Sequence, residues 1–281
     1  MKPTIALLTD FGDQDPYVGI MKGVITNLCP SAQLIDIVHE IPPGNISNAA
    51  FQLWQSAPYF PKGTIFLAVV DPGVGTSRTP IIMQTEDHIF IGPDNGIFTY
   101  IMDNNPLAWS LENPLYQLPN PSTTFHGRDI FAPAAAHAAL GTPGPEFGSV
   151  LPEIVKLPNP ILQSTGQGDL RGEILFADLF GNLITSLGKF HNQDDSVWLY
   201  QPWIGGTSPF QLNLHQSILQ LSGGKILPWA QTFGKIPTNT CAAIIGSSGL
   251  VEIVANGKSA AKILSLRSYS LTLKTAQPLG A

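Results

Sequence analysis

Apolar runs and helical stretches alternate along residues 1–163 of the chain. Each apolar run has the length of a buried strand and ends at turn or polar residues; the runs are TIALLTDFG, LIDIVHEIPP, GTIFLAVVDPG and HIFIGPDNG. Helices are predicted from Pro16 to about Cys29 with Asp15 as N-cap, after a cap at Ser47, over GIFTYIMD, and over DIFAPAAAHAAL with Asp129 as cap. This alternation predicts an α/β domain with a mostly parallel sheet and helices on both faces.

Polar residues come directly after the predicted strands. Asp10 follows the first strand, His39 the second and Asp71 the third, and residues 93–95 (Pro-Asp-Asn) follow the fourth. In open α/β sheets, ligands bind beyond the carboxyl ends of the strands. The pattern therefore predicts a binding site at this edge of the sheet.

The alternation of strands and helices ends at a Gly-rich polar stretch, of which residues 164–170 are predicted to be a linker. Beyond it, residues 171–281 contain short β-rich runs, among them GEILFADLFGNLITSL, SVWLYQPW and CAAIIGSSGLVEIVANG. Gly, Asn and Pro turns separate these runs, and helical periodicity is weak. The pattern predicts a second, smaller, all-β domain folded as a barrel.

Composition narrows the class of protein. Of the 281 residues, 43% are hydrophobic and 12% charged, which is typical of a compact globular protein. Fourteen basic and twenty acidic residues give a net charge of −6, which argues against a nucleic-acid-binding surface. The sequence contains no uninterrupted apolar stretch of about 18 residues, the length that would predict a membrane span. The apolar run at residues 5–8 is too short for a signal peptide. The two cysteines, Cys29 and Cys241, fit buried thiols of a reducing compartment, so a cytoplasmic location is expected.

No cofactor fingerprint is complete. GQGDLRG, at residues 166–172, has Arg171 where the third glycine of a dinucleotide-binding motif belongs. No metal is predicted, because no pair of candidate ligands has a recognisable spacing. A metal site remains an alternative, with the candidate ligands Asp10, Asp15, His39 and His126.

Three stretches together resemble the S-adenosylmethionine hydroxide adenosyltransferases, namely TDFGDQDPYVGIMKG (9–23), DPGVGTSR (71–78) and TFHGRDIFAPAAAH (124–137). FADLFGNLITSL (176–187) and IIGSSGLVEIVANG (244–257) look like the C-terminal motifs of that family. These enzymes are hydrolytic relatives of fluorinating and chlorinating enzymes. The resemblance implies attack of water or hydroxide at the ribose C5′ of S-adenosylmethionine, giving adenosine and methionine. It also implies a homotrimer, in which substrate lies between the N-terminal domain of one subunit and the C-terminal domain of its neighbour.

By this resemblance, Asp71, Arg78 and His126 form the water-activating triad. Displacing a neutral thioether from a sulfonium requires a good nucleophile and little acid assistance. A guanidinium and an imidazole beside water favour hydroxide, and a carboxylate orients the nucleophile or accepts its proton. The rigid Pro72-Gly73 turn is expected to hold the acid in place.

The resemblance also implies the substrate contacts. Asp10 matches a carboxylate that accepts both ribose hydroxyls, and Phe180 and Asn182 match residues around the adenine. The halogenating branch has an arginine where Ser248 stands and an aromatic residue where Gly44 stands, so the methionine carboxylate needs another partner here. The matches at the methionine end are Asp178, facing the amino group, with Ser247, Ser248 and Glu252.

Two other functions remain as alternatives. The first is a halogenase on the same fold, which is disfavoured because Asp71 would repel a halide. The second is a non-catalytic sensor of adenosine or S-adenosylmethionine, for which an intact triad would be superfluous. The products formed with and without chloride would separate the three functions.

Overall fold

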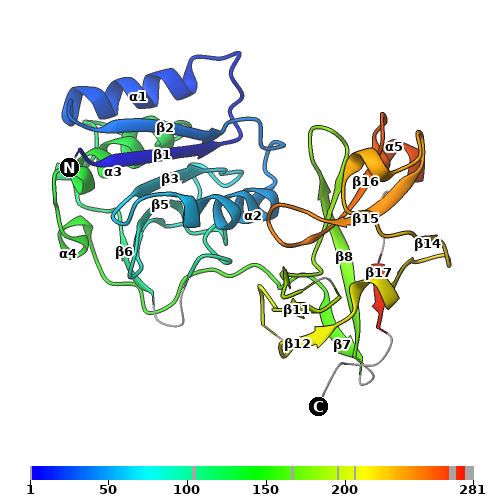
Figure 1. Ribbon diagram of the computed structural model, residues 1–281. Coiled ribbons are helices and arrows are strands. Elements are labelled where there is room, and N and C mark those ends of the chain that lie inside the picture. The colour runs from blue at the N-terminus through cyan, green and yellow to red at the C-terminus, as the bar shows by residue number, and fades with distance from the viewer. Residues whose placement is uncertain are drawn as a thin grey trace. The chain divides into compact units, whose positions relative to one another are not determined.

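The computed structural model describes residues 2–102, 106–165, 168–194, 196–205, 207–265 and 270–275. The chain divides into two compact units, Met1–Leu157 and Pro158–Ala281, which are called the first and the second unit below. Figure 1 shows helices gathered around the sheet of the first unit and strands dominating the second.

The first unit contains a six-stranded sheet. Its strands are β1 (Thr4–Thr9), β2 (Gln33–Val38), β3 (Ile65–Val69), β4 (Pro80–Gln84), β5 (Ile89–Pro93) and β6 (Leu107–Ser110). Their order is β2-β1-β3-β5-β4-β6; the first four are parallel, and β4 runs antiparallel to both β5 and β6. The predicted mostly parallel sheet is confirmed, although the sequence analysis identified neither β4 nor β6.

Helices cover both faces of this sheet (Figure 1). Successive residues of a strand point to opposite faces, so each central strand contributes side chains to two hydrophobic cores, one on each face of the sheet. Leu7 belongs to the core with α1 (Tyr17–Leu28) and α3 (Ala132–Ala139), whereas Leu8 belongs to the core with α2 (Ile46–Ser56). Because the central strands are buried on both sides, they are continuous apolar runs, which is why the sequence reveals them.

Two helix caps differ from the sequence prediction. Pro16 is the N-cap of α1, so Asp15 lies outside the helix and makes no capping bond. Asn45, not Ser47, caps α2, because its side chain accepts a hydrogen bond from the backbone N of Asn48 at 3.0 Å. The Ser47 hydroxyl donates to the same Asn45 oxygen at 3.0 Å, so it supports the cap from inside the helix.

Two further expectations about helices were wrong. The described part of GIFTYIMD, residues 96–102, forms turns instead of a helix: Gly96 has φ +96, and the backbone N of Thr99 donates to its carbonyl at 3.0 Å. Asp103 lies outside the described residues. Asp129 is not a cap, because it lies inside a π-helix, η3 (Gly127–Phe131), that precedes α3. Its side chain is buried and accepts a hydrogen bond from the backbone N of Ser122 at 2.8 Å. The other short helices are η1 (Ala57–Tyr59), η2 (Pro114–Tyr116), α4 (Gly144–Phe147), η4 (Leu214–Gln216), η5 (Phe233–Lys235) and α5 (Ala260–Leu264).

The second unit is mostly antiparallel sheet. Its strands are β7 (Leu162–Thr165), β8 (Asp169–Ala177), β9 (Leu183–Thr185), β10 (Phe190–Asn192), β11 (Trp198–Tyr200), β12 (Phe210–Leu212), β13 (Ile218–Leu221), β14 (Ile226–Leu227), β15 (Cys241–Ile245), β16 (Val251–Ala255) and β17 (Ser270–Lys274). An eight-stranded sheet has the order β14-β13-β17-β8-β9-β16-β15, with β7 paired to β8. Its two ends meet, because Trp229, just after β14, bridges Ala243 of β15. The predicted β-barrel is therefore confirmed as a nearly closed antiparallel sheet.

The boundary between the units falls at Pro158, earlier than the sequence suggested. The described residues of the predicted linker, 164–165 and 168–170, instead belong to the hairpin of β7 and β8, in which Thr165 pairs with Asp169. Gly168 has φ +86, a conformation that glycine adopts without strain. A Gly-rich composition is typical of tight turns as well as linkers, which explains the misplacement; residues 166–167 lie outside the described part.

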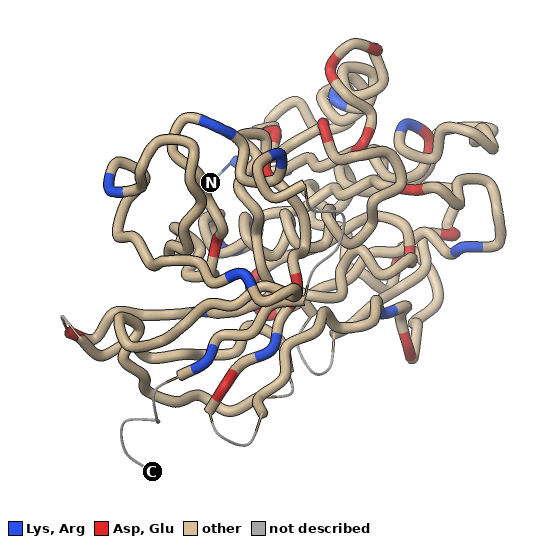
Figure 2. The backbone as a smooth tube through the Cα atoms, turned by 90° about the vertical axis from the view of Figure 1, so that its right-hand side faces the viewer, with Lys and Arg blue, Asp and Glu red and all other residues tan. Residues whose placement is uncertain are grey.

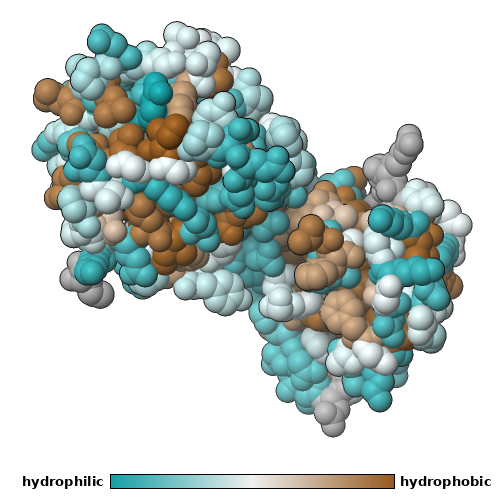
Figure 3. All heavy atoms as spheres, turned by 90° about the horizontal axis from the view of Figure 1, so that it is seen from above, coloured by the Kyte–Doolittle hydropathy of each residue, from teal (hydrophilic) through white to brown (hydrophobic). Residues whose placement is uncertain are grey.

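Three further observations concern the described residues. No helix among them is both long and apolar enough to cross a membrane. Figure 2 shows the lysines and arginines dispersed along the backbone. On the face seen in Figure 3, apolar residues of the first unit are exposed between hydrophilic ones.

Candidate active site

The end of β3 brings Asp71 to the carboxyl edge of the first unit's sheet. The carbonyl of Val70 accepts a hydrogen bond of 2.9 Å from Nδ2 of Asn95, which lies just after the neighbouring strand β5. The carbonyl of Asp71 accepts one of 3.3 Å from the backbone N of Val74, which closes the Pro-Gly turn. The backbone is thus fixed on both sides of the acid. The sequence analysis placed Asn95 at this edge but did not predict its contact.

Asp71 and Arg78 form a buried ion pair. Nε of Arg78 donates to Oδ1 at 3.0 Å and to Oδ2 at 2.8 Å, and Nη2 also donates to Oδ2. The side chain of Asp71 is 5% exposed and that of Arg78 is 9% exposed. A forked contact of this kind fixes the plane of the guanidinium as well as its position. The turn therefore holds the guanidinium in one orientation.

His126 completes a chain of three side chains. Nη2 of Arg78 lies 2.7 Å from Nδ1 of His126. A guanidinium only donates hydrogen bonds, so Nδ1 accepts, and the neutral ring carries its proton on Nε2. Burial, and then the positive charge of Arg78, lowers the pKa of His126, which keeps the ring neutral at pH 7.

Two contacts that the sequence analysis missed support this chain. The ring of Phe131, in η3, lies against the guanidinium, with Cζ of Arg78 5.3 Å from the ring centroid. Gly75 has φ +74, and a Cβ there would collide with the carbonyl of Thr123. Only glycine therefore lets the Pro-Gly turn approach the segment that leads to His126.

Asp10 lies at the same edge of the sheet. It follows β1, which runs parallel to β3 with Thr9 opposite Val69. Oδ2 of Asp10 accepts a hydrogen bond of 2.8 Å from the backbone N of Gly44. A Cβ on Gly44 would lie 3.6 Å from Cβ of Pro72, so Gly44 stands between Asp10 and the turn that carries the ion pair.

In the second unit, the turn between β8 and β9 contains three of the predicted substrate contacts. Oδ1 and Oδ2 of Asp178 accept hydrogen bonds from the backbone N and Nδ2 of Asn182, at 2.8 Å and 2.9 Å. The turn projects Leu179 and Phe180, which are 98% and 78% exposed. An exposed ring on a fixed turn is suited to stacking against a planar ligand.

A pocket of about 510 Å³ lies beside this ring. Its volume falls within the usual range for small-molecule sites. The residues that line it are Phe180, Asn182, Phe233, Ala255, Gly257, Lys258 and Ser259.

The turn between β15 and β16 holds Ser247 and Ser248, and Glu252 lies on β16. The Glu252 carboxyl group occupies the space that Gly246 leaves free, where a Cβ would collide with it. Burial, and then the negative charge of Asp178, raises the pKa of Glu252. The charge of Asp178 therefore acts on Glu252, the other acid that the resemblance places at the methionine end.

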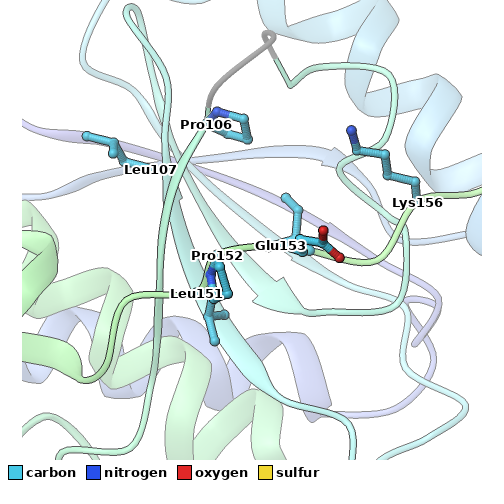
Figure 4. Close-up of a pocket in the computed structure, with 7 residues that line it drawn as sticks. Pro106, Leu107, Leu151, Pro152, Glu153 and Lys156 are labelled. Atoms are coloured by element: carbon cyan, nitrogen blue, oxygen red, sulfur yellow. The ribbon is translucent and has the colours of Figure 1, made fainter.

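The alternative metal site is not assembled in the described part of the chain, where no group of three or more His, Cys, Asp or Glu residues could hold a metal ion. Nδ1 of His39 contacts Oγ1 of Thr9 at 2.9 Å instead. A separate pocket of about 540 Å³ lies at the edge strand β6, where Leu107 and Glu153 are among its lining residues (Figure 4). None of the predicted site residues lines that pocket.

Comparison with known proteins covers most of the chain. Residues 5–148 match the family model described as the SAM hydroxide adenosyltransferase N-terminal domain, and residues 172–270 match the C-terminal domain. An (R)-S-adenosyl-L-methionine hydrolase of Thermus thermophilus is 36% identical, over 95% of this chain and 97% of the relative. A fluorinase of an Actinoplanes species is 27% identical, over 66% of this chain and 72% of the relative. A crystal structure of an uncharacterized conserved protein from Thermotoga maritima matches with a TM-score of 0.78 and 33% identity, over 96% of this chain and 99% of that one.

Proposed function

Because this chain belongs to the S-adenosylmethionine hydroxide adenosyltransferase family, we propose that it hydrolyses (R)-S-adenosyl-L-methionine to adenosine and L-methionine. The observation that carries the mechanism is the hydrogen-bonded chain of Asp71, Arg78 and His126 at the carboxyl edge of the sheet. This chain ends in donors: Nη1 of Arg78 is buried and has no hydrogen-bond partner among the described residues, and the neutral His126 ring carries a proton on Nε2.

These donors stabilise negative charge on an attacking oxygen. The water oxygen attacks C5′ of the ribose while the C5′–S bond breaks, and the electron pair of that bond neutralises the sulfonium to give the thioether of methionine. The proton that the water loses passes to solvent. Donors aimed at the developing hydroxide favour its formation and need no reorganisation during the reaction.

Asp71 orients the guanidinium that donates to the nucleophile, and it does not itself take the proton. Both of its oxygens accept hydrogen bonds from Arg78, so the carboxylate sets the plane of the guanidinium. The same carboxylate disfavours a halide, which would lie beside a buried negative charge.

Product identification tests the reaction. The purified protein is incubated with (R)-S-adenosylmethionine in oxygen-labelled water, with and without chloride, and the products are identified by mass. Adenosine with one labelled oxygen, together with methionine, is expected in both cases. A 5′-chlorinated nucleoside would make the protein a halogenase, and binding without any product would make it a sensor.

The substrate contacts belong to the same proposal. Asp10 accepts the two ribose hydroxyls, and Phe180 stacks on the adenine, with Asn182 as its polar neighbour. The ring is exposed and borders a pocket, which supports this assignment. At the methionine end, the proposed contacts are Asp178, Ser247, Ser248 and Glu252.

The proposal includes a homotrimer with sites shared between subunits. Its support is the division of the site residues between the two units, and the exposure of Leu179 and Phe180 in a single chain. It also includes a cytoplasmic location, which the two buried free thiols, Cys29 and Cys241, favour.

A further inference from the structure

A series of polar side chains ends beside Asp10 and takes no part in the proposed chemistry. It begins at Lys22, whose Nζ donates to Oδ2 of Asp36 at 2.6 Å. Oδ1 of Asp36 lies 3.0 Å from Nε2 of His39, a side chain that is only 4% exposed. Nδ1 of His39 lies 2.9 Å from Oγ1 of Thr9, the residue immediately before Asp10.

The chemistry of these groups gives the series a direction. A carboxylate only accepts, so Asp36 favours the ring proton of His39 on Nε2, although that contact is close but poorly aligned. Nδ1 then accepts from the hydroxyl of Thr9. Oγ1 of Thr9 in turn accepts from the backbone N of Phe11 at 3.3 Å. The series therefore reaches both neighbours of Asp10 in the sequence.

The backbone of His39 holds the same loop at a second point. Its carbonyl accepts a hydrogen bond of 2.8 Å from the backbone N of Gly12. Thr9 is fully buried and His39 is 5% exposed, so these polar groups are withdrawn from water, which is unfavourable unless they are paired. Apolar residues would fill this space without that requirement. The hydrogen bonds thus fix the loop after β1 in a way that packing alone would not.

We propose that His39 is a positioning residue that sets the place of the Asp10 carboxylate and, through it, the affinity for the ribose diol. The inference rests on the proposed function, in which Asp10 accepts both ribose hydroxyls. A displaced carboxylate weakens a contact that substrate and adenosine share. The triad is carried by other segments, so the chemical step keeps its geometry.

Side-chain replacements along the series test this role. His39→Leu and Thr9→Val each remove one partner of the Nδ1 contact. Each is expected to raise the adenosine Kd, measured by calorimetry, and the KM by about tenfold, with kcat changed by less than about twofold. The double variant is expected to be no worse than the worse single one, because both remove the same contact.

Two conservative variants separate positioning from a general loss of packing. His39→Asn places an amide oxygen near the position of Nδ1 and is expected to restore most of the adenosine affinity. His39→Gln places its amide near Nε2, away from Thr9, and is expected to restore little. His88→Leu is the matched control. This half-buried imidazole of the same unit packs on Phe66, with the two ring centroids 5.2 Å apart, and no described contact joins it to the loop after β1. It is expected to lower Tm and leave the adenosine Kd unchanged.

The outcomes distinguish the inference from the function on which it rests. If Asp10→Ala raises the adenosine Kd while folded His39→Leu and Thr9→Val proteins bind as the wild type does, His39 has no positioning role. A fall of kcat in these two variants by as large a factor as the rise of KM would also overturn the inference. If Asp10→Ala itself leaves the Kd unchanged, the assignment of Asp10 to the ribose fails, and the inference fails with it. Thr9→Val keeps the test decisive should His39→Leu not fold.

Discussion

The two halves of the candidate site differ in how much of their geometry a single chain provides. In the first unit, Asp71 and Arg78 are nearly inaccessible and are linked to His126 by hydrogen bonds. In the second unit, Asp178 fixes its own turn, and Phe180 stands 78% exposed at the tip. The groups proposed to act on the nucleophile are thus preorganised, whereas the ring proposed to stack on the adenine is exposed in a single chain.

The requirements of the reaction explain this difference. Electrostatic stabilisation of a developing hydroxide depends on donors that need no reorganisation, so a small displacement is costly. Stacking on a base tolerates variation, because it depends on contact area more than on direction. The predictions below test whether the locked half serves catalysis and the open half serves binding.

The largest effect is expected from breaking the locked half. Asp71→Ala, Arg78→Ala and His126→Ala are each expected to lower kcat by about 10²–10⁴-fold, the usual range for groups that assist proton movement, with the adenosine Kd nearly unchanged. Stopped assays with product quantification give kcat, and calorimetry gives Kd. Because the three side chains form one connected chain, double variants should be little worse than single ones. A variant with near-normal kcat would remove its residue from the triad.

A second large effect is expected from combining defects in the two halves. His126→Ala and Asn182→Ala proteins are each expected to be nearly inactive, and mixing them under conditions of subunit exchange is expected to restore activity well above that of either parent. The reason is that the proposed trimer, when mixed, would pair an intact first unit with an intact second unit from another chain. Exchange is checked by native mass spectrometry of differently tagged chains. Demonstrated exchange without recovery would place the site within one chain.

The next prediction compares one residue type in the two halves. Phe131 is fully buried against Arg78, so Phe131→Ala is expected to lower the free energy of unfolding by about 3–5 kcal/mol and to lower kcat. Phe180→Ala is expected to change stability by less than about 0.5 kcal/mol. It should instead raise the adenosine Kd about tenfold through lost stacking. Urea unfolding and calorimetry provide the two measurements; a large loss of stability in Phe180→Ala would contradict the comparison.

The sequence predicted the framework of the molecule better than the contacts within it. Strands buried on both faces, such as β1 and β3, are continuous apolar runs, and their order with the helices defined an α/β domain. The inner strand β4 and the edge strand β6 were not predicted, because β4 departs from the alternation of parallel strands and helices, running antiparallel to both of its neighbours, and β6 has only four residues. Asn45 caps α2 in place of the expected Ser47, because both residue types cap helices and only the geometry shows that the Asn45 oxygen accepts from the backbone N of Asn48 while Ser47 donates to the same oxygen.

The candidate site shows the same limit. Asp10 and Asp71 were predicted from their place after strands, a signal that parallel sheets provide. Arg78 and His126 were identified only through the family resemblance, because residues so far apart in sequence have no spacing that predicts contact. Asn95 acts through a backbone carbonyl, a contact that depends on tertiary structure and leaves no local pattern.

The smallest effects are expected from pH, and they should differ between the halves. The pKa of His126 is lowered by burial and by Arg78, below its ordinary value near 6.5. The ring therefore stays neutral as pH falls through that value, and kcat is expected to decline only below it. As pH falls, His126 takes up its proton in the unfolded chain before it does so in the folded protein. The contribution of His126 to the free energy of unfolding is therefore fully present above pH 6.5 and is lost as pH falls through the folded-state pKa.

In the second unit the shift has the opposite sign. Burial, with the charge of Asp178, raises the pKa of Glu252, so this carboxyl group takes up its proton above its ordinary range as pH falls. Because Glu252 is proposed to face the substrate and not the attacking oxygen, KM is expected to change, by less than about tenfold, while kcat stays flat over the same interval. Full pH profiles of kcat and KM, with Glu252→Gln as the variant that cannot titrate, provide the measurement. In that variant the KM inflection should disappear and the decline of kcat at lower pH should remain. If both profiles instead moved together and both responded to Glu252→Gln, the division between a catalytic half and a binding half would not hold.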